Sequence, residues 1–142
     1  RAEMKEVFVV ENPVVVEVAA TKLGPRCVPL ICTEGQPASA VRKLLRLLSH
    51  AGALINLHAD FDWRGLSFVD QLLGIPGTAP WRMDTASYQC ATGTVRLANQ
   101  PHLPSWSERL ADEMRGSGTA VYEEQILPLL LEDLARDADS AG

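Results

Sequence analysis

The sequence has few of the features that mark secreted, zinc-binding or membrane proteins. It contains three cysteines in 142 residues, an odd number with no CxxC spacing. This pattern fits neither a disulfide framework nor a zinc site, and we predict that all three are reduced. No apolar run approaches the roughly 20 residues that cross a bilayer, and residues 1–5 lack the layout of a secretory signal. We therefore predict a cytoplasmic protein without membrane contact.

Positive charge is also scarce. Lysine and arginine together number 13 against 18 aspartates and glutamates, which gives a formal net charge of −5. A free-standing, non-specific nucleic-acid binder usually carries a basic face, so the composition argues against that class. Any contact with DNA would need help from another part of the full protein, from a partner or from a metal ion.

The length and apolar content are those of one domain. A chain of 142 residues that is 46% hydrophobic can bury one sizeable core. Because the first residue is arginine rather than methionine and a strand-like run begins a few residues later, we expect the chain to be a fragment of a longer protein.

Short apolar runs alternate with helical patterns along the first part of the chain. Asn12 and Pro13 suit the cap and first turn of a helix. Repeated βα units predict an α/β fold, with a parallel sheet covered by helices on both faces. We expect strands at 6–11, 28–32, 53–58 and 79–83, and helices at 14–22, 38–50, 66–73 and near 85. These core units cover residues 1–85, and residues 86–142 form a helical extension with helices at 105–115 and 121–135 and a frayed acidic end at 132–139.

Acidic residues follow two of these strands. Glu11 ends the first strand, and Asp60 and Asp62 follow the third. Residues two apart in an extended backbone project to the same side, and parallel sheets bind ligands beyond the carboxyl ends of their strands. Oxygen ligands without histidine or thiol suit Mg²⁺ or Mn²⁺ better than zinc. Alternatively, an aspartate after a strand can form a turn or cap a helix, and Glu11 can face a helix N-terminus.

Five further residues are weaker candidates. Glu34 follows the second strand, where it is either a turn residue or part of the site. His58 could orient a ligand or phosphate, although a histidine at a strand end is more often structural, and Arg64 is a candidate phosphate contact. Glu123 and Glu124 would supply a further acid if the last helix folded back over the site; we favour the alternative that they form a solvated first helical turn.

The acidic pattern resembles the Toprim domain, the metal-binding module of topoisomerases, primases and related nucleases. That domain has a glutamate after its first strand and an Asp-x-Asp after its third, which correspond here to Glu11, Asp60 and Asp62, and Gly65 matches a glycine common just downstream. The resemblance covers residues 1–85 and implies a three-layer α/β/α fold with a mainly parallel four-stranded sheet. It also implies that the aspartates hold Mg²⁺ or Mn²⁺ against a DNA phosphate, with Glu11 as general acid or base or as a further ligand.

A narrower resemblance extends over nearly the whole chain. It is to an uncharacterised bacterial family that is similar to the A subunit of topoisomerase VI and is associated with condensin-like SMC defence operons of the Wadjet type. The matching segments are residues 10–13, 32–37, 60–66 and 80–83. This resemblance implies the C-terminal Toprim domain of a nuclease-like subunit, with DNA and SMC-like ATPase subunits as partners and with homodimer formation.

Three functions remain open at this stage. The first is a metal-dependent DNA endonuclease inside an SMC-linked complex, and the second is a Toprim module that binds DNA or a partner subunit without cleaving. The third is a phosphohydrolase of the haloacid-dehalogenase class, whose Asp-x-Asp follows the first strand rather than the third. We favour the first because all three acids are present. Topoisomerase VI relatives use a tyrosine from a separate domain, and since Tyr88 and Tyr122 lie outside the acidic cluster we expect hydrolysis by water.

Overall fold

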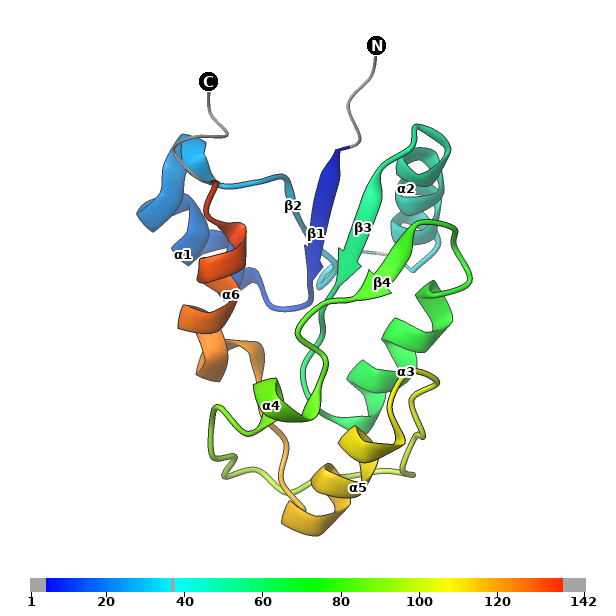
Figure 1. Cartoon of the computed structure of the whole chain (residues 1–142), viewed down its shortest axis with the longest axis vertical. Helices are drawn as coiled ribbons and strands as arrows, with labels where there is room; N and C mark the ends of the chain where they lie inside the picture. Colours follow the sequence, from blue (N-terminus) through cyan, green and yellow to red (C-terminus); the bar gives the residue numbers. More distant parts are fainter. Residues whose placement is uncertain (1–4, 37, 137–142) are drawn as a thin grey trace.

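A computed structural model describes residues 5–36 and 38–136, which form an α/β fold around one parallel sheet (Figure 1). Val9, in the central strand β1, pairs with Ile31 on one side and with Leu57 on the other. All three neighbouring strand pairs are parallel. The sheet order is β2-β1-β3-β4, with β1 (Glu6–Val10), β2 (Leu30–Cys32), β3 (Leu54–Leu57) and β4 (Thr78–Pro80). The predicted α/β class and four-stranded sheet are confirmed.

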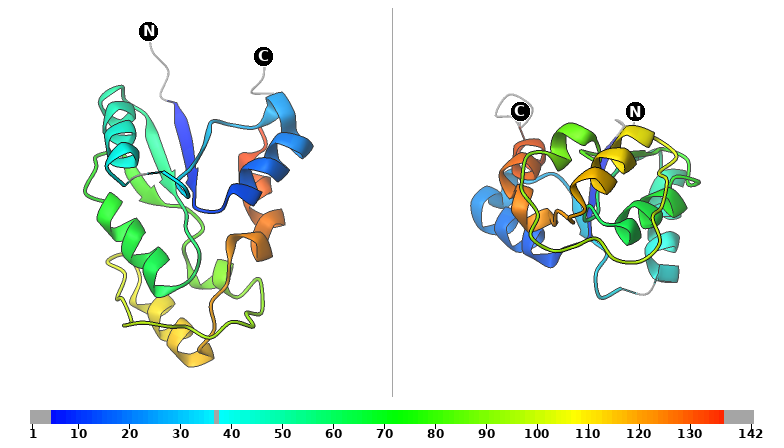
Figure 2. Two further views of the ribbon diagram at one scale, coloured as in Figure 1. Left: turned by 180° about the vertical axis from the view of Figure 1, so that it is seen from behind. Right: turned by 90° about the horizontal axis from the view of Figure 1, so that it is seen from below.

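Helices cover both faces of this sheet, as predicted (Figures 1 and 2). One face carries α1 (Pro13–Leu23) and α6 (Leu127–Leu134), and the other carries α2 (Ala38–His50) and α3 (Trp63–Leu72). Two further helices, α4 (Thr85–Tyr88) and α5 (Glu108–Ser117), lie beyond the carboxyl ends of the strands. The described part of the chain contains no helix that is long and apolar enough to span a membrane.

Local sequence signals account for the first helices. The side chain of Asn12 accepts a hydrogen bond from the N–H of Val14 at 2.9 Å, and Pro13 occupies the first turn of α1, so the predicted cap is confirmed. Helix α2 has the predicted bounds. It buries Val41 and Leu45 against the sheet, because its apolar residues recur at helical spacing.

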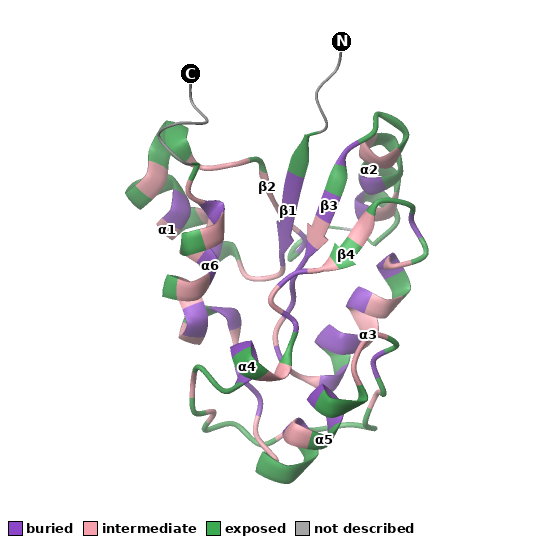
Figure 3. Ribbon diagram, in the orientation of Figure 1, coloured by how far each residue is buried: buried purple, intermediate pink, exposed green. Residues whose placement is uncertain are grey.

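The core lies between the sheet and the helices. Most of β1, alternate residues of β3 and the inward faces of the helices are buried (Figure 3). Phe8 of β1 packs edge-on against Trp81, with ring centroids 4.7 Å apart; burying a side chain of this size contributes roughly 2 kcal/mol. Cys27, Cys32 and Cys90 are free thiols, as predicted.

Two predicted element starts are corrected by helix capping. Helix α3 begins at Trp63 rather than 66 because Asp62 caps it by accepting from the N–H of Gly65. Helix α5 begins at Glu108 rather than 105 because Ser107 caps it through the N–H of Leu110. In both cases the capping side chain satisfies a backbone donor that has no partner within the helix.

The predicted helix at 121–135 is wrong in its first part. Val121 and Thr119 instead form isolated antiparallel bridges with Phe61 and Arg96. A 3₁₀ turn (Glu123–Ile126) follows, and α6 begins only at Leu127, with Pro128 in its first turn, where a missing N–H is tolerated. Of the predicted frayed end at 132–139, residues 137–139 lie outside the described residues.

Polar contacts at the end of β4 anchor α6 to the sheet. Asp133 accepts hydrogen bonds from Trp81 Nε1 at 2.6 Å and from Arg82 Nε at 2.7 Å. The hydrogen-bonded Arg82 guanidinium lowers the pKa of Asp133. The N–H of Val28 also donates to the carbonyl of Leu134. These contacts hold α6 against the residues that follow β4 and the segment that precedes β2.

Candidate functional site

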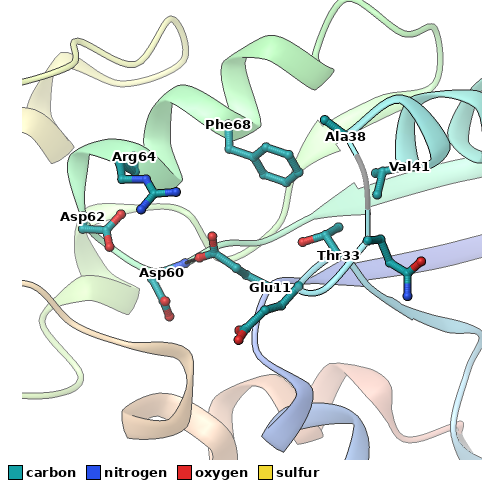
Figure 4. A pocket seen from close by; sticks show the side chains of 10 residues that line it. Glu11, Thr33, Ala38, Val41, Asp60, Asp62, Arg64 and Phe68 are labelled. Carbon is teal, nitrogen blue, oxygen red and sulfur yellow. Dashed lines mark hydrogen bonds between the residues drawn. The ribbon is translucent and has the colours of Figure 1, made fainter.

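A cavity of about 470 Å³ lies at the carboxyl ends of the first three strands, where a parallel sheet is expected to bind its ligand. Its acidic end is formed by Glu11, Asp60 and Asp62, next to Arg64, whereas Phe68 lines a less polar part (Figure 4). The other lining residues are Thr33, Glu34, Gln36, Ala38 and Val41. The structure therefore brings the three predicted acids, Glu34 and Arg64 to one pocket.

Glu11 follows β1 directly and connects it to the aspartate loop. Its Oε1 accepts a hydrogen bond from the N–H of Asp60 at 3.1 Å. Burial raises the pKa of Glu11, and the negative charges of Asp62 and Glu123 raise it further. The carboxyl of Glu11 is thus held at the pocket in surroundings that disfavour its charge.

Asp60 is the most strongly perturbed acid of the pocket. Its Oδ1 accepts a hydrogen bond from the N–H of Glu123 at 2.7 Å. Burial, followed by the charges of Glu11 and Glu123, raises the pKa of Asp60 from 3.8 to about 8. In the described part of the chain no lysine or arginine forms a salt bridge with the acids of the pocket. The pocket therefore concentrates negative charge that a cation or a proton would relieve.

Asp62 both caps a helix and lines the pocket, so the two alternatives weighed for it coexist. Its Oδ1 accepts from the N–H of Gly65 at 2.7 Å. Its own N–H donates to the carbonyl of Asp60 at 2.9 Å, which makes a tight turn at Phe61 instead of the extended backbone expected between the two aspartates. A Cβ atom on Gly65 would lie 2.0 Å from the Asp60 carbonyl oxygen. The glycine therefore permits the close approach of α3 to the aspartate loop.

The prediction for Glu123 is wrong, because the fold buries this residue. We favoured a solvated helical turn for this residue, but its side chain is fully buried. Its Oε1 accepts from the N–H of Glu11 at 3.0 Å and from that of Asn12 at 2.6 Å. Its Oε2 lies 2.7 Å from His58 Nδ1. The neighbouring Glu124 is exposed, as predicted. No local pattern indicated the buried role, because every partner of the Glu123 side chain lies far away in the sequence.

His58 lies behind the pocket rather than in it. Its side chain is fully buried and packs edge-on against Phe61 and Trp81, at centroid distances of 5.6 and 5.7 Å. Its Nε2 atom has no hydrogen-bond partner among the described residues. His58 therefore contacts Glu123 and does not face the pocket. Of the three residues predicted to contact a phosphate or ligand, the other two, Arg64 and Glu34, are exposed.

The three acids have the chemistry that Mg²⁺ or Mn²⁺ requires. Each of Glu11, Asp60 and Asp62 has one carboxylate oxygen held by a backbone N–H. Across residues 5–36 and 38–136, however, no group of three or more His, Cys, Asp or Glu side chains is arranged as a ready-made metal cage. Mg²⁺ commonly uses one or two carboxylates and completes its shell with water and substrate phosphate. The pocket fits that kind of open, partly hydrated site.

Comparisons with known proteins identify a family without an assigned activity. Residues 1–134 match the family described as "Protein of unknown function C-terminus (DUF2399)". A search of curated proteins found no match. Activity therefore has to be inferred from the geometry of the pocket.

We predict that Gly65→Ala lowers the free energy of unfolding by about 1–3 kcal/mol, because the new methyl group must displace the Asp60 carbonyl. Chemical denaturation measures this change. The matched control is Gly116→Ala in α5, where nothing lies within 4 Å of the new Cβ and the helix should gain about 0.5–1 kcal/mol. Equal stabilities of Gly65→Ala and wild type would contradict the close-packing argument.

We also predict that Asp60→Asn stabilises the metal-free protein increasingly as the pH rises from about 4 to about 8. The folded pKa of Asp60 is raised to about 8, so the folded state retains a proton that the unfolded state has released, and the wild type loses stability across this range. Asparagine cannot ionise and still accepts from the Glu123 N–H. The gain at pH 8 should be of order 1–3 kcal/mol once solvent screening is allowed for.

Thermal unfolding in EDTA between pH 4 and 8 tests the Asp60→Asn prediction. The exposed Asp112→Asn in α5 shows the effect of removing one surface carboxylate. If Asp60→Asn is no more stable than wild type at pH 8, the crowding of negative charge in the pocket is not a real feature of the folded protein.

Proposed function

The chain belongs to the family described as protein of unknown function C-terminus (DUF2399), and we propose that it cleaves DNA by divalent-metal-dependent phosphodiester hydrolysis. Because the family has no assigned activity, the proposal rests on the residues of the site. Glu11, Asp60 and Asp62 would hold Mg²⁺ or Mn²⁺. The observation that carries this proposal is the convergence of the three carboxylates in one pocket at the carboxyl edge of a parallel sheet. The Toprim resemblance of the sequence supports the same assignment.

The protein groups of the pocket suit proton transfer and charge neutralisation. When bound, the divalent ion would offset phosphate charge, polarise the phosphoryl group and lower the pKa of a coordinated water. Burial raises the pKa of Glu11 above its usual range, which makes its carboxyl a candidate for proton exchange with the substrate or with water. Arg64 at the same end of the pocket (Figure 4) can contact a phosphate oxygen.

A second cavity supports an extended ligand rather than a small phosphate ester. It measures about 540 Å³ and shares Arg64 and Phe68 with the acidic pocket. A polynucleotide strand could follow this path, with its phosphates at Arg64 and a base on the face of Phe68. Polar, uncharged groups supply much of its lining, which also includes Trp63, Ser67, Gln71, Asn99, Gln100, Pro101 and His102.

The proposed setting is the larger complex that the narrower sequence resemblance implies. In it, this domain would be the nuclease-like subunit of an SMC-type plasmid-defence complex, with DNA and SMC-like ATPase subunits as partners. The net charge of −5 agrees with a domain that receives DNA from other subunits, because such a surface attracts a polyanion weakly by itself.

A catalytically incomplete module that binds DNA or a partner subunit is the second candidate. The absence of a ready-made three-ligand metal group within the described ranges favours it. The Asp-x-Asp pair follows β3, which disfavours a phosphohydrolase of the haloacid-dehalogenase class, because that class places the pair after the first strand.

Calorimetric titration with Mn²⁺ and Mg²⁺, followed by nicking of supercoiled plasmid, tests the proposed function. We predict that the wild-type chain binds Mn²⁺ and that Asp60→Ala/Asp62→Ala does not, since two of the three ligands are lost. The matched control, Glu108→Gln/Asp112→Asn, removes two exposed carboxylates from α5 and should bind like wild type. We further predict Mn²⁺-dependent nicking that falls by a factor of order 10² or more in the Asp60/Asp62 variant.

The outcomes separate the two candidate functions. Metal binding without nicking, both by this chain and by a longer protein that contains it, would support the binding module. Nicking by the longer protein alone would assign part of the catalytic machinery to residues outside this chain. Absence of metal binding in the wild type, with and without DNA, would contradict the proposed metal site.

A further inference from the structure

Glu123 connects the two loops that carry the acids of the pocket. Its carboxylate accepts hydrogen bonds from the backbone N–H groups of Glu11 and Asn12, and its own N–H donates to Asp60 Oδ1 at 2.7 Å. One residue thereby fixes the backbone after β1 and the first aspartate after β3. The two loops are held together by a segment more than sixty residues further along the chain.

The backbone on either side of these contacts is also fixed. The N–H of Phe61 donates to the carbonyl of Val121 at 2.8 Å, and the N–H of Val121 donates to the carbonyl of Phe61 at 3.1 Å. Phe61 stands between the two aspartates and is itself fully buried. The position of Glu123 relative to Asp60 and Asp62 is therefore set by paired backbone hydrogen bonds.

His58 completes this arrangement from the buried side. Its Nδ1 lies 2.7 Å from Glu123 Oε2, and both side chains are fully buried, while its Nε2 has no partner among the described residues. Burying a carboxylate and leaving a ring nitrogen unsatisfied are both costly, and apolar residues of similar size would often be no less stable. The pair therefore adds little stability that apolar side chains could not supply, and what it does contribute is a defined geometry.

We propose that Glu123 is a positioning residue that holds Glu11 and Asp60 in the arrangement needed for the metal and DNA site, and that His58 orients Glu123. This inference rests on the proposed function and deepens it. Glu123 does not line the acidic pocket, so it acts through the residues that do. In metal sites, groups that are hydrogen-bonded to the ligands commonly fix the orientation of those ligands, and Glu123 would act in the same way.

Two variants of Glu123 separate a positioning role from simple stability. Glu123→Ala leaves two backbone N–H groups and His58 Nδ1 without their acceptor. Glu123→Gln retains an oxygen for the backbone donors, and its amide N–H can donate to Nδ1 if His58 adopts the other tautomer. The matched control is Leu72→Ala, which removes a buried side chain at the end of α3 remote from Asp62 and so destabilises the fold without touching the site.

The first measurement is the Mn²⁺ affinity of each variant, taken at a temperature where all are folded. We expect Glu123→Ala to bind Mn²⁺ about 10- to 100-fold more weakly than wild type. Glu123→Gln should recover most of that affinity, and Leu72→Ala should bind like wild type despite its lower melting temperature. Wild-type affinity in folded Glu123→Ala would overturn the inference.

The second measurement does not depend on metal and keeps the inference separate from the proposed function. Amide hydrogen exchange in EDTA compares the N–H groups of Glu11 and Asn12 with that of Val9 in β1. We expect exchange at Glu11 and Asn12 to accelerate selectively in Glu123→Ala, but not in Glu123→Gln or Leu72→Ala. If wild type binds no Mn²⁺, the proposed function fails, and the exchange comparison alone tests the role of Glu123. Selective acceleration at Glu11 and Asn12 in Glu123→Ala would support the positioning role, and uniform exchange would overturn it.

Discussion

The site depends on hydrogen bonds between the segment after α5 and the loops that carry the acids. Phe61 and Val121 exchange backbone hydrogen bonds, and Glu123 then reaches both the turn after β1 and the side chain of Asp60. Anchoring of α6 by Asp133 holds the same segment from its other side. The C-terminal segment therefore helps to shape the pocket. The acids that follow β1 and β3 are held in place by residues far away in the sequence.

The negative charge that this geometry gathers in the pocket would be relieved by a proton or by a cation. Glu11, Asp60 and Asp62 are each held by a backbone N–H through one oxygen, which fixes these carboxyl groups close to one another. Burial and neighbouring negative charge raise the pKa of Asp60 to about 8, because the pocket disfavours a further ionised carboxyl. A divalent cation bound together with a phosphate would resolve that conflict, which is the physical basis of the proposed chemistry.

Local patterns in the sequence predicted much of the fold and the acids that face the pocket. The Asn12–Pro13 cap and the bounds of α2 follow from short-range rules. The meeting of Glu11, Asp60 and Asp62 in one pocket follows from their positions after strands of a parallel sheet. Glu123 could not be predicted in this way, because its burial results from a bridge between residues sixty positions apart. The sequence left His58 either a ligand contact or, as we favoured, a structural residue; the fold directs its side chain to a buried acid, a partner that no local pattern indicated.

Crystals of the protein grown with Mn²⁺ and with a short DNA duplex would test the central claim most directly, through anomalous diffraction at the manganese absorption edge. The account predicts an anomalous peak in the acidic pocket, coordinated by carboxylate oxygens of Glu11, Asp60 or Asp62 together with water or phosphate. A well-ordered pocket without such a peak, or a peak bound to other residues alone, would contradict the assignment of these acids as metal ligands.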